Sequence, residues 1–436
     1  MTRWYADRAW LGVADGVAER VSITTEADRI TEVAVGVAPG HGDTRLPGLV
    51  IPGLVNAHSH AFHRALRGRT HGGRGDFWTW RDQMYEVAAR LDPDTYRDLA
   101  AATYAEMVLA GITTVVEFHY LHHAPGGQRY EEPNVMGHAL HEAARAAGIR
   151  LVLLDTCYLR ADVDGTPLAG PQLRFGDAGA EAWAVRAAAG PATGAAIHSV
   201  RGCPPDAMRT VAEWAAQRGA PLHLHLSEQR KENDACLAVH GRTPAELCAE
   251  TGVLGERTTA VHATHLSAGD IRRLGDTRTA TCFCPTTERE LADGVGPAAD
   301  LVRAGSVLSL GSDSHAVIDL FEEARAVELN ERLVTERRGH HTAETLLRAA
   351  TVGGAHAAGL DAGRIATGAS ADFTAVRLDS VRLAGHGDLV SAVVYAATAS
   401  DVTDVVAAGQ LVVSGGEHQR IRDVASALDD AVRAVL

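Results

Sequence analysis

Eight short apolar segments, each followed by a helical pattern, limit the fold of this chain more than any other feature. The segments begin at Val50, Ile112, Leu151, Ala195, Leu222, Thr259, Ala280 and Val307. Strands that alternate with helices indicate a parallel sheet, and eight such units are typical of a closed (β/α)8 TIM barrel. A chain of 436 residues has room for a barrel of about 250 residues and one appended unit.

The two ends of the chain have a different pattern. Residues 1–48 alternate apolar and polar side chains in short runs, as at 20–23 and 30–35, which is typical of antiparallel strands. Short strands are expected again at 363–366, 371–376 and 405–413, before a closing helix over 423–436. Chain ends often lie close together. We therefore predict a small β-sandwich from residues 1–48 and 362–436, beside a catalytic barrel over residues 49–361.

The connection after the first barrel strand is unusually long. We expect a loop that contains residues 77–81 (Phe-Trp-Thr-Trp-Arg), anchored by aromatic packing. A helix over residues 92–110 follows, with Pro93 in its first turn and Gly111 as its stop.

Composition excludes several classes of function. A net charge of −14 offers no general basic surface to a nucleic acid. No run of 18 or more apolar residues predicts a membrane helix, and the first residues lack the apolar core of a signal peptide. The six cysteines show no paired CxxC spacing, so we interpret them as reduced thiols of a cytoplasmic protein.

The first barrel strand ends in His58-Ser59-His60. Side chains two residues apart on a strand leave the same face, so both histidines point to one place, as two metal ligands must. Two buried, hydrogen-bonded histidines at a strand end would show the same pattern. Partners are needed to separate these interpretations.

Candidate partners follow other strands. The fifth strand ends at His225 with Glu228 three residues on, the sixth ends at His262, and the eighth ends at Asp313. Three histidines and a carboxylate suit one Zn²⁺ or another divalent ion. Deeper in the fifth strand, His223 has either a structural role or a supporting role at the site.

These residues together resemble the amidohydrolase superfamily, over the whole chain. The resemblance implies His58, His60, His225 and Asp313 as ligands of the metal. Members with two metals carry a carboxylated lysine on strand four, but residues 195–201 contain none and Lys231 is the only lysine. One ion per subunit is therefore expected. The His-x-x-Glu at 225–228 is similar to the deaminase branch, and relatives imply a homodimer.

The resemblance also implies catalytic roles. Zn²⁺ lowers the pKa of a bound water to about 7, and Asp313 accepts its proton during attack on a C=N carbon. Glu228 carries a proton to the leaving nitrogen. His262 polarises the water, with His265 as the alternative for that role.

Several stretches resemble superfamily members that act on a small amidine with two carboxylates. They are residues 58–64, 77–81, 117–123, 198–201, 284–288 and 311–315. Arginine binds carboxylates with two parallel hydrogen bonds, which assigns Arg81 and Arg201 to the substrate. Tyr120 and His198 would orient it. His63 stands where many family members carry glutamine, close to the substrate.

Three alternatives stay open. The substrate could be another small C=N compound, such as a purine, a pyrimidine or a guanidino acid. Hydrolysis of a ring, as by imidazolonepropionase, is disfavoured by the Glu228 spacing. A catalytically dead scaffold is the alternative outside enzymes. No P-loop, GxGxxG or GxSxG pattern occurs, which argues against a nucleotide cofactor or a serine nucleophile.

Overall fold

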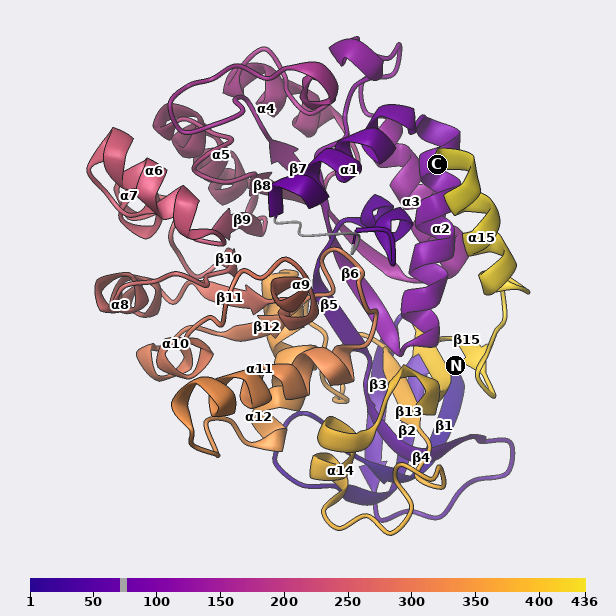
Figure 1. The fold of residues 1–436 in the computed structure, drawn as a ribbon. Helices are drawn as coiled ribbons and strands as arrows, with labels where there is room; N and C mark the ends of the chain where they lie inside the picture. The colour runs from indigo at the N-terminus through magenta and orange to yellow at the C-terminus, as the bar shows by residue number, and fades with distance from the viewer. Residues whose placement is uncertain (71–76) are drawn as a thin grey trace.

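The barrel is one parallel sheet closed on itself (Figure 1). The computed structural model describes residues 1–70 and 77–436, with the side chains of the helix that begins at Phe77 described from Trp80 onward. The barrel strands are β5 (Leu54–Ser59), β6 (Ile112–His119), β7 (Arg150–Cys157), β8 (Gly194–Ile197), β9 (Leu222–Leu226), β10 (Thr258–His262), β11 (Ala280–Phe283) and β12 (Leu308–Leu310). A bridge between Ser59 and Asp313 joins the last strand to the first. The predicted (β/α)8 barrel is confirmed.

Helices connect the barrel strands and continue the chain after the last one. They are α1 (Phe77–Arg90), α2 (Pro93–Leu109), α3 (Val135–Ala147), α4 (Ala180–Ala189), α5 (Pro205–Arg218), α6 (Arg230–His240), α7 (Pro244–Glu250), α8 (Ala268–Asp276), α9 (Pro285–Glu290), α10 (Ala298–Ala304), α11 (Leu320–Thr335), α12 (Ala343–Arg348), α13 (Gly354–Ala357) and α14 (Leu389–Ala396). Short 3-10 turns follow β5 (η1, Ala61–Leu66) and precede α4 (η3, Gly170–Arg174). Among the described helices, none is both long and apolar enough to cross a bilayer.

A second, mixed sheet combines both ends of the chain. Its strands, in spatial order, are β16 (Glu417–His418), β15 (Gln410–Ser414), β14 (Val402–Ala407), β13 (Phe373–Val376), β4 (Thr44–Pro52), β1 (Thr2–Ala9), β2 (Ala18–Glu26) and β3 (Arg29–Val35). Trp4 and Phe373, from opposite ends of the sequence, pack edge to face with ring centroids 5.6 Å apart. The predicted pairing of the termini is confirmed, while the domain boundaries at residues 48/49 and 361/362 stay predictions.

Gly53 separates the two sheets at the start of the barrel. β4 belongs to the terminal sheet up to Pro52, and β5 begins one residue after the glycine. A Cβ atom at Gly53 would lie 2.1 Å from Thr113 Oγ1, so only glycine lets the chain pass this close to β6. The apolar run near Val50 is therefore two strands rather than one.

Three other local predictions are wrong. Residues 77–81 begin helix α1 instead of a loop, because Trp80, Met84, Val87 and Ala88 repeat with helical spacing and bury one face. Residues 363–366 form bends and irregular backbone instead of a strand.

Residues 405–413 form a hairpin rather than a single strand. β14 and β15 are joined at Ala408 and Gly409, which both have positive φ.

The closing helix agrees with its prediction. α15 (Val424–Val435) begins after Asp423, whose side chain accepts a hydrogen bond from Ser426 N at 3.0 Å. Its apolar face, which includes Val424, Leu428 and Val435, is buried. Figure 1 shows it in yellow beside α2 in purple, so the end of the chain braces the second helix of the barrel.

Candidate active site

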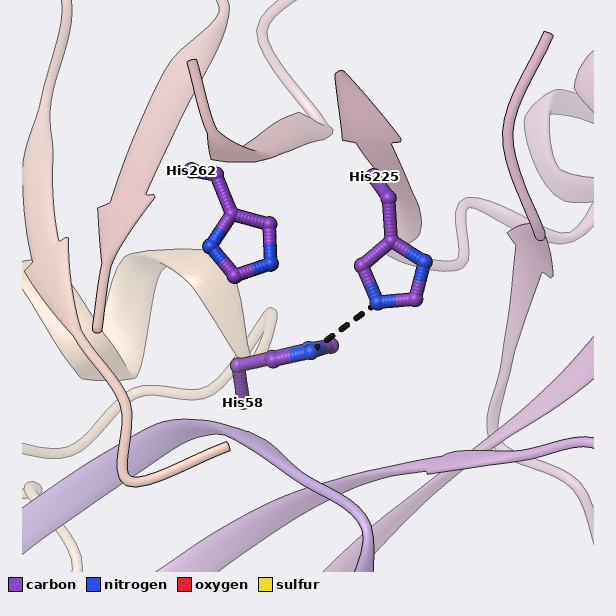
Figure 2. Close-up of side chains that lie close together, drawn as sticks. All are labelled: His58, His225 and His262. Atoms are coloured by element: carbon purple, nitrogen blue, oxygen red, sulfur yellow. Dashed lines mark hydrogen bonds between the residues drawn. The ribbon is translucent and has the colours of Figure 1, made fainter. Parts of the chain in front are cut away.

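Side chains from four barrel strands meet at one buried point. His58 lies in β5, His225 in β9 and His262 in β10, while Asp313 follows β12. Figure 2 shows the rings of the three histidines turned toward one another. His58 Nε2 lies 3.2 Å from His225 Nε2 and 3.4 Å from Asp313 Oδ1. His60 Nε2 lies 3.5 Å from the same carboxylate oxygen. The structure thus brings together all four predicted metal ligands, together with His262.

Backbone carbonyl groups fix the orientation of two of these rings. His60 Nδ1 donates to the carbonyl of Phe118 at 2.9 Å, and His225 Nδ1 donates to the carbonyl of His198 at 2.9 Å. Each bond sets the tautomer, so that Nε2 faces the centre with its lone pair. Second bonds of this kind are typical of histidines that bind metal.

Burial keeps these histidines neutral. It lowers the pKa of His60 to about 3, and the adjacent His58 acts in the same direction. Burial likewise lowers the pKa of His58 and, more strongly, that of His225. A divalent cation needs unprotonated imidazole as a ligand, so the protonation state suits a metal.

The seam between β12 and β5 positions Asp313. Its backbone N donates to the carbonyl of His58 at 3.0 Å, and its carbonyl accepts from His60 N at 3.3 Å. A Cβ atom at Gly311 would lie within 2.7 to 2.9 Å of His58 atoms, so a glycine is needed at this approach. The carboxylate is therefore placed by the closing of the barrel itself.

The donor set fits a single metal ion. His58, His60 and Asp313 offer ligand atoms within 4.8 Å of one another, and His58, His225 and His262 do the same. The two groups share His58, so five side chains surround the site. Imidazoles with a carboxylate are the donors of many catalytic zinc sites.

A cluster of carboxylates surrounds His262. Its Nε2 lies 3.7 Å from Glu228 Oε1, and its Nδ1 lies 3.4 Å from Glu288 Oε1. Asp293 joins Glu228 and His262 in a third group of atoms within 4.8 Å. Burial alone would lower the pKa of His262, but Glu228, Glu288 and Asp313 together raise it well above its ordinary value. These carboxylates therefore favour the protonated form of His262.

One cavity opens onto this point and collects the predicted residues. It is lined by His60, His63, Trp80, Arg81, Met84, Tyr85, Tyr120, Tyr158, His198, Arg201, His225, Glu228, His262, Leu291 and Asp313. Every residue predicted for the metal, the substrate or catalysis lines it, apart from His58, which lies buried at its base. The side chains of residues 77–79 lie outside the described ones.

An aromatic wall of Trp80, Tyr85, Tyr120 and Tyr158 lines the cavity, and its residues Tyr85 and Tyr158 are not among the predicted ones. Tyr158 stacks on His198 with centroids 3.8 Å apart. Gln172 Nε2 donates to Tyr85 Oη at 3.0 Å and to Tyr158 Oη at 3.4 Å. Tyr158 directly follows β7, so the strand-end rule that located the histidines would also have located it. Tyr85 lies on α1, where a loop was expected.

Only Tyr120 of the stretch 117–123 reaches the cavity. Its Oη lies 2.9 Å from His63 Nε2. His122 and His123 instead lie behind the wall, where their backbone N atoms donate to the carbonyl of Arg174. The Arg174 side chain is fully buried and donates to the carbonyls of His123, at 2.7 Å, and Ala88. It therefore ties α1 to the segment after β6.

Glu117, from the same stretch, hydrogen-bonds to residues next to His58 and His60 in the sequence. Its carboxylate accepts from Ser59 Oγ and from Ala61 N, both at 2.7 Å. Burial raises its pKa to about 7, against these two bonds. Ser59 Oγ also lies 3.2 Å from His315 Nε2. The residue between the two histidines is thus held on both sides.

The two predicted arginines have different surroundings. Arg201 is buried, and its Nε donates to Glu232 Oε2 at 2.9 Å, while its Nη2 lies 3.7 Å from Glu228 Oε2. Arg81 lies on α1 with its guanidinium carbon 5.5 Å from the centre of the Tyr85 ring. Their side chains enter the cavity from separate walls.

The positions of His265, His223 and Lys231 decide what each of them can do at the site. His265 lines a separate hollow with Arg230 and Asn233, so His262 is the histidine of the cavity. His223 lies deeper, with its Nε2 2.8 Å from the carbonyl oxygen of Ala357, which is a structural role. Lys231 is exposed on α6, so it does not occupy the position on the fourth barrel strand, β8, where members with two metals carry their lysine.

Comparison with known proteins agrees with this geometry. The model of the Amidohydrolase family matches residues 49–412. The chain belongs to the amidohydrolase family. This amidohydrolase is 36% identical to formimidoylglutamate deiminase of Pseudomonas aeruginosa, over 96% of each chain. It is 31% identical to 5-methylthioadenosine/S-adenosylhomocysteine deaminase of Natronomonas pharaonis, over 85% of this chain and 82% of the relative.

Two solved structures are similar throughout. An amidohydrolase from Brucella melitensis superposes with a TM-score of 0.91 at 30% identity, covering both chains completely. An adenosine deaminase from Xanthomonas campestris with bound zinc superposes with a TM-score of 0.84 at 25% identity, over 99% of this chain and 97% of that one. Family and relatives together identify this amidohydrolase as a hydrolase of C–N bonds, related to deaminases of C=N substrates.

Proposed function

We propose that this amidohydrolase uses one Zn²⁺ per subunit to deaminate N-formimidoyl-L-glutamate, giving N-formyl-L-glutamate and ammonia, a step of histidine degradation. The observation that carries the proposal is the cavity, which joins a metal-ligand cluster at one end to Arg81 and Arg201 on its walls. A small amidine with two carboxylates presents the groups that these ends select. The 36% identity to formimidoylglutamate deiminase over nearly the whole chain supports the same substrate.

The two carboxylates in the cavity suit opposite tasks. Burial alone would raise the pKa of Asp313, but the contact with His58 and the surrounding histidines bring it below its ordinary value. Burial raises the pKa of Glu228, against His262 and Arg201. Environments that push two acids apart in this way assign a base and an acid. Asp313 is the base, and Glu228 is the acid.

The reaction then follows from these two residues. His58, His60, His225 and Asp313 would hold Zn²⁺, which supplies an activated water and polarises the C=N bond. As water attacks the formimidoyl carbon, Asp313 Oδ2, 3.9 Å from His262 Nε2, takes its proton. Glu228 gives its proton to the terminal amidine nitrogen, and Asp313 then passes the water proton to the same nitrogen. The C–N bond breaks as the proton of the C–OH group returns to Glu228, so that the formyl C=O forms, NH₃ leaves and both carboxylates are restored. His262, which lines the same cavity, stabilises negative charge that develops on the oxygen of the tetrahedral carbon.

A second candidate function has its own support. The aromatic wall of Trp80, Tyr85, Tyr120 and Tyr158 offers stacking surfaces to a flat ring. Relatives named as deaminases of methylthioadenosine and of 8-oxoguanine are 31% and 32% identical. A purine would stack on this wall, but it has no carboxylate that Arg81 and Arg201 could bind.

An ammonia-release assay separates the two. The purified zinc-loaded protein is given N-formimidoyl-L-glutamate, adenosine, 5-methylthioadenosine or 8-oxoguanine. We expect ammonia and an equal amount of N-formyl-L-glutamate from the first compound only. Release of ammonia from a purine, with none from the amidine, would assign the second function. The homodimer and the cytoplasmic location stay proposals, and sedimentation velocity tests the first.

A further inference from the structure

Glu232, at the start of α6, makes two hydrogen bonds that connect separate parts of the site. Its Oε2 accepts from Arg201 Nε at 2.9 Å, and its Oε1 accepts from Ser227 N at 3.1 Å. Arg201 follows strand β8, while Ser227 follows β9 and directly precedes Glu228. The side chain of Glu232 is completely buried, so water does not compete for either bond. One carboxylate thus fixes an arginine of the cavity and the turn that carries the proposed acid.

Only a carboxylate can make both bonds. Two N–H donors, one from Arg201 and one from Ser227, face the two oxygens of Glu232. A glutamine of the same shape has one acceptor oxygen, so its NH₂ group would face one of the donors. The turn also needs support, because Ser227 has φ of +52°, a conformation that side chains other than glycine seldom adopt.

Charge gives Glu232 a second effect on the site. Arg201 lies between two acids, with Glu232 at 2.9 Å and Glu228 at 3.7 Å. Without Glu232, Glu228 would be the nearest acid to the buried guanidinium among the described residues, and the guanidinium would turn toward it. An ion pair there would hold Glu228 ionised and would turn the arginine away from an incoming carboxylate.

We propose that Glu232 is a positioning residue, which holds Arg201 ready for a substrate carboxylate and holds the turn that directs Glu228 at the leaving nitrogen. Neither the reacting atoms nor the cavity lining includes Glu232. The inference rests on the proposed function, because that function gives Arg201 and Glu228 their roles. It adds a residue that couples substrate binding to proton transfer.

Kinetics of three variants test the proposal. Glu232→Gln removes one bond and the charge, Glu232→Asp keeps the charge and both acceptor oxygens, and Asp234→Asn removes the charge of an exposed residue of the same helix. For Glu232→Gln we expect kcat/KM to fall about 10- to 100-fold, as for a lost buried hydrogen bond to a charged group. The loss should appear in both a raised KM and a lowered kcat. Glu232→Asp should recover part of it, and Asp234→Asn should match wild type.

A double-mutant cycle with Arg201→Met separates positioning from general stability. If Glu232 acts through Arg201, the KM effect of Glu232→Gln should disappear in the Arg201→Met background, because coupled residues are not additive. Equal KM effects in both backgrounds would overturn the proposal. So would a Glu232→Gln protein with wild-type kcat and KM.

Crystal structures of wild type and Glu232→Gln give a reading that needs no substrate. We expect the Arg201 guanidinium to turn toward Glu228 and the turn at Ser227 to shift. If the Arg201 guanidinium and the turn at Ser227 keep their wild-type positions within about 0.5 Å, the proposal is overturned, even for a folded, active variant. If wild type itself releases no ammonia from N-formimidoyl-L-glutamate, the proposed function fails, and these structures alone decide the role of Glu232.

Discussion

The metal-ligand end of the cavity and its aromatic wall are built in different ways. At the ligand end, His58, His60, His225 and Asp313 lie at strand ends. Backbone carbonyls orient the rings of His60 and His225, and backbone hydrogen bonds to His58 and His60 place Asp313. The wall instead combines α1 and the segments after β6 and β7, and the turn η3 supports it. Side-chain bonds from Gln172 and Arg174 hold these pieces together.

The difference separates chemistry from selectivity. A barrel sheet places its strand ends rigidly, so residues there suit a metal that tolerates little displacement. Segments outside the sheet tolerate substitution without loss of the fold. We therefore expect changes at the ligand end to abolish the reaction and changes in the wall to alter substrate binding. The predictions below test that contrast, from the largest effect to the smallest.

Removal of the metal should have the largest effect. After chelation and dialysis we expect no measurable ammonia release, and activity should return with added Zn²⁺. Stability should fall as well, because a ligand present at 1,000 times its Kd contributes about 4 kcal/mol to the folded state. Thermal unfolding and metal analysis measure both effects.

The matched control is His58→Ala, whose melting temperature should not respond to the chelator. Full activity in a protein shown to be metal-free would contradict the proposed ligand set.

Glu228→Gln should lower kcat by about 10² to 10⁴, the usual contribution of a general acid. Because the pKa of Glu228 is raised by burial, wild type holds the needed proton at low pH and loses it as the pH rises. The rate should therefore fall on the alkaline side of that pKa. In the variant this fall should disappear, while bound zinc stays at the wild-type level.

Glu213→Gln, at an exposed position on α5, is the control for the loss of one acid. A pH–rate profile of Glu228→Gln with the same alkaline limb as wild type would exclude Glu228 as the acid.

Arg174→Met should weaken the wall without touching the ligand end. The substitution leaves the buried carbonyls of His123 and Ala88 without this donor. We expect the free energy of unfolding to fall by about 2 kcal/mol and KM to rise about tenfold, as α1 loosens from the segment after β6. Denaturant unfolding and steady-state kinetics measure the two. A fall in zinc content would show that the two regions are not independent.

His63→Gln should have the smallest effect. Glutamine can still hydrogen-bond to Tyr120 Oη in place of His63 Nε2, so we expect KM to change less than about threefold. His63→Leu, which has no polar group, should cost about tenfold. Equal losses in the two variants would show that the ring, and not its hydrogen bond, is what the substrate needs.

The same contrast explains what the sequence could predict. Strand ends obey a simple rule, because apolar runs mark the strands and the next residues face the cavity. That rule located His225, His262 and Asp313 without any knowledge of tertiary contacts. It would also have located Tyr158, which follows β7 in the same way.

The remainder depends on contacts between distant segments. Tyr85 lies on a helix where the sequence predicts a loop, and it contacts Gln172, which is 87 positions away in the chain. Glu232 has no distinguishing signal in the sequence, because an acid in the first turn of a helix is common at exposed positions. Only the fold shows that it is buried against Arg201. Such residues have no periodic pattern of their own, so their partners set their importance.

The seam at Ser59 and Asp313 has a consequence for how the protein is made. Residues at positions 58, 60 and 313 become neighbours only when the last barrel strand docks beside the first. A ribosome that has released only the first seven strands has made every ligand histidine but not the carboxylate. Ring closure and completion of the ligand set are therefore one event. A metal bound by all four ligands would therefore stabilise the closed barrel, because separating the last strand from the first would also release the ion.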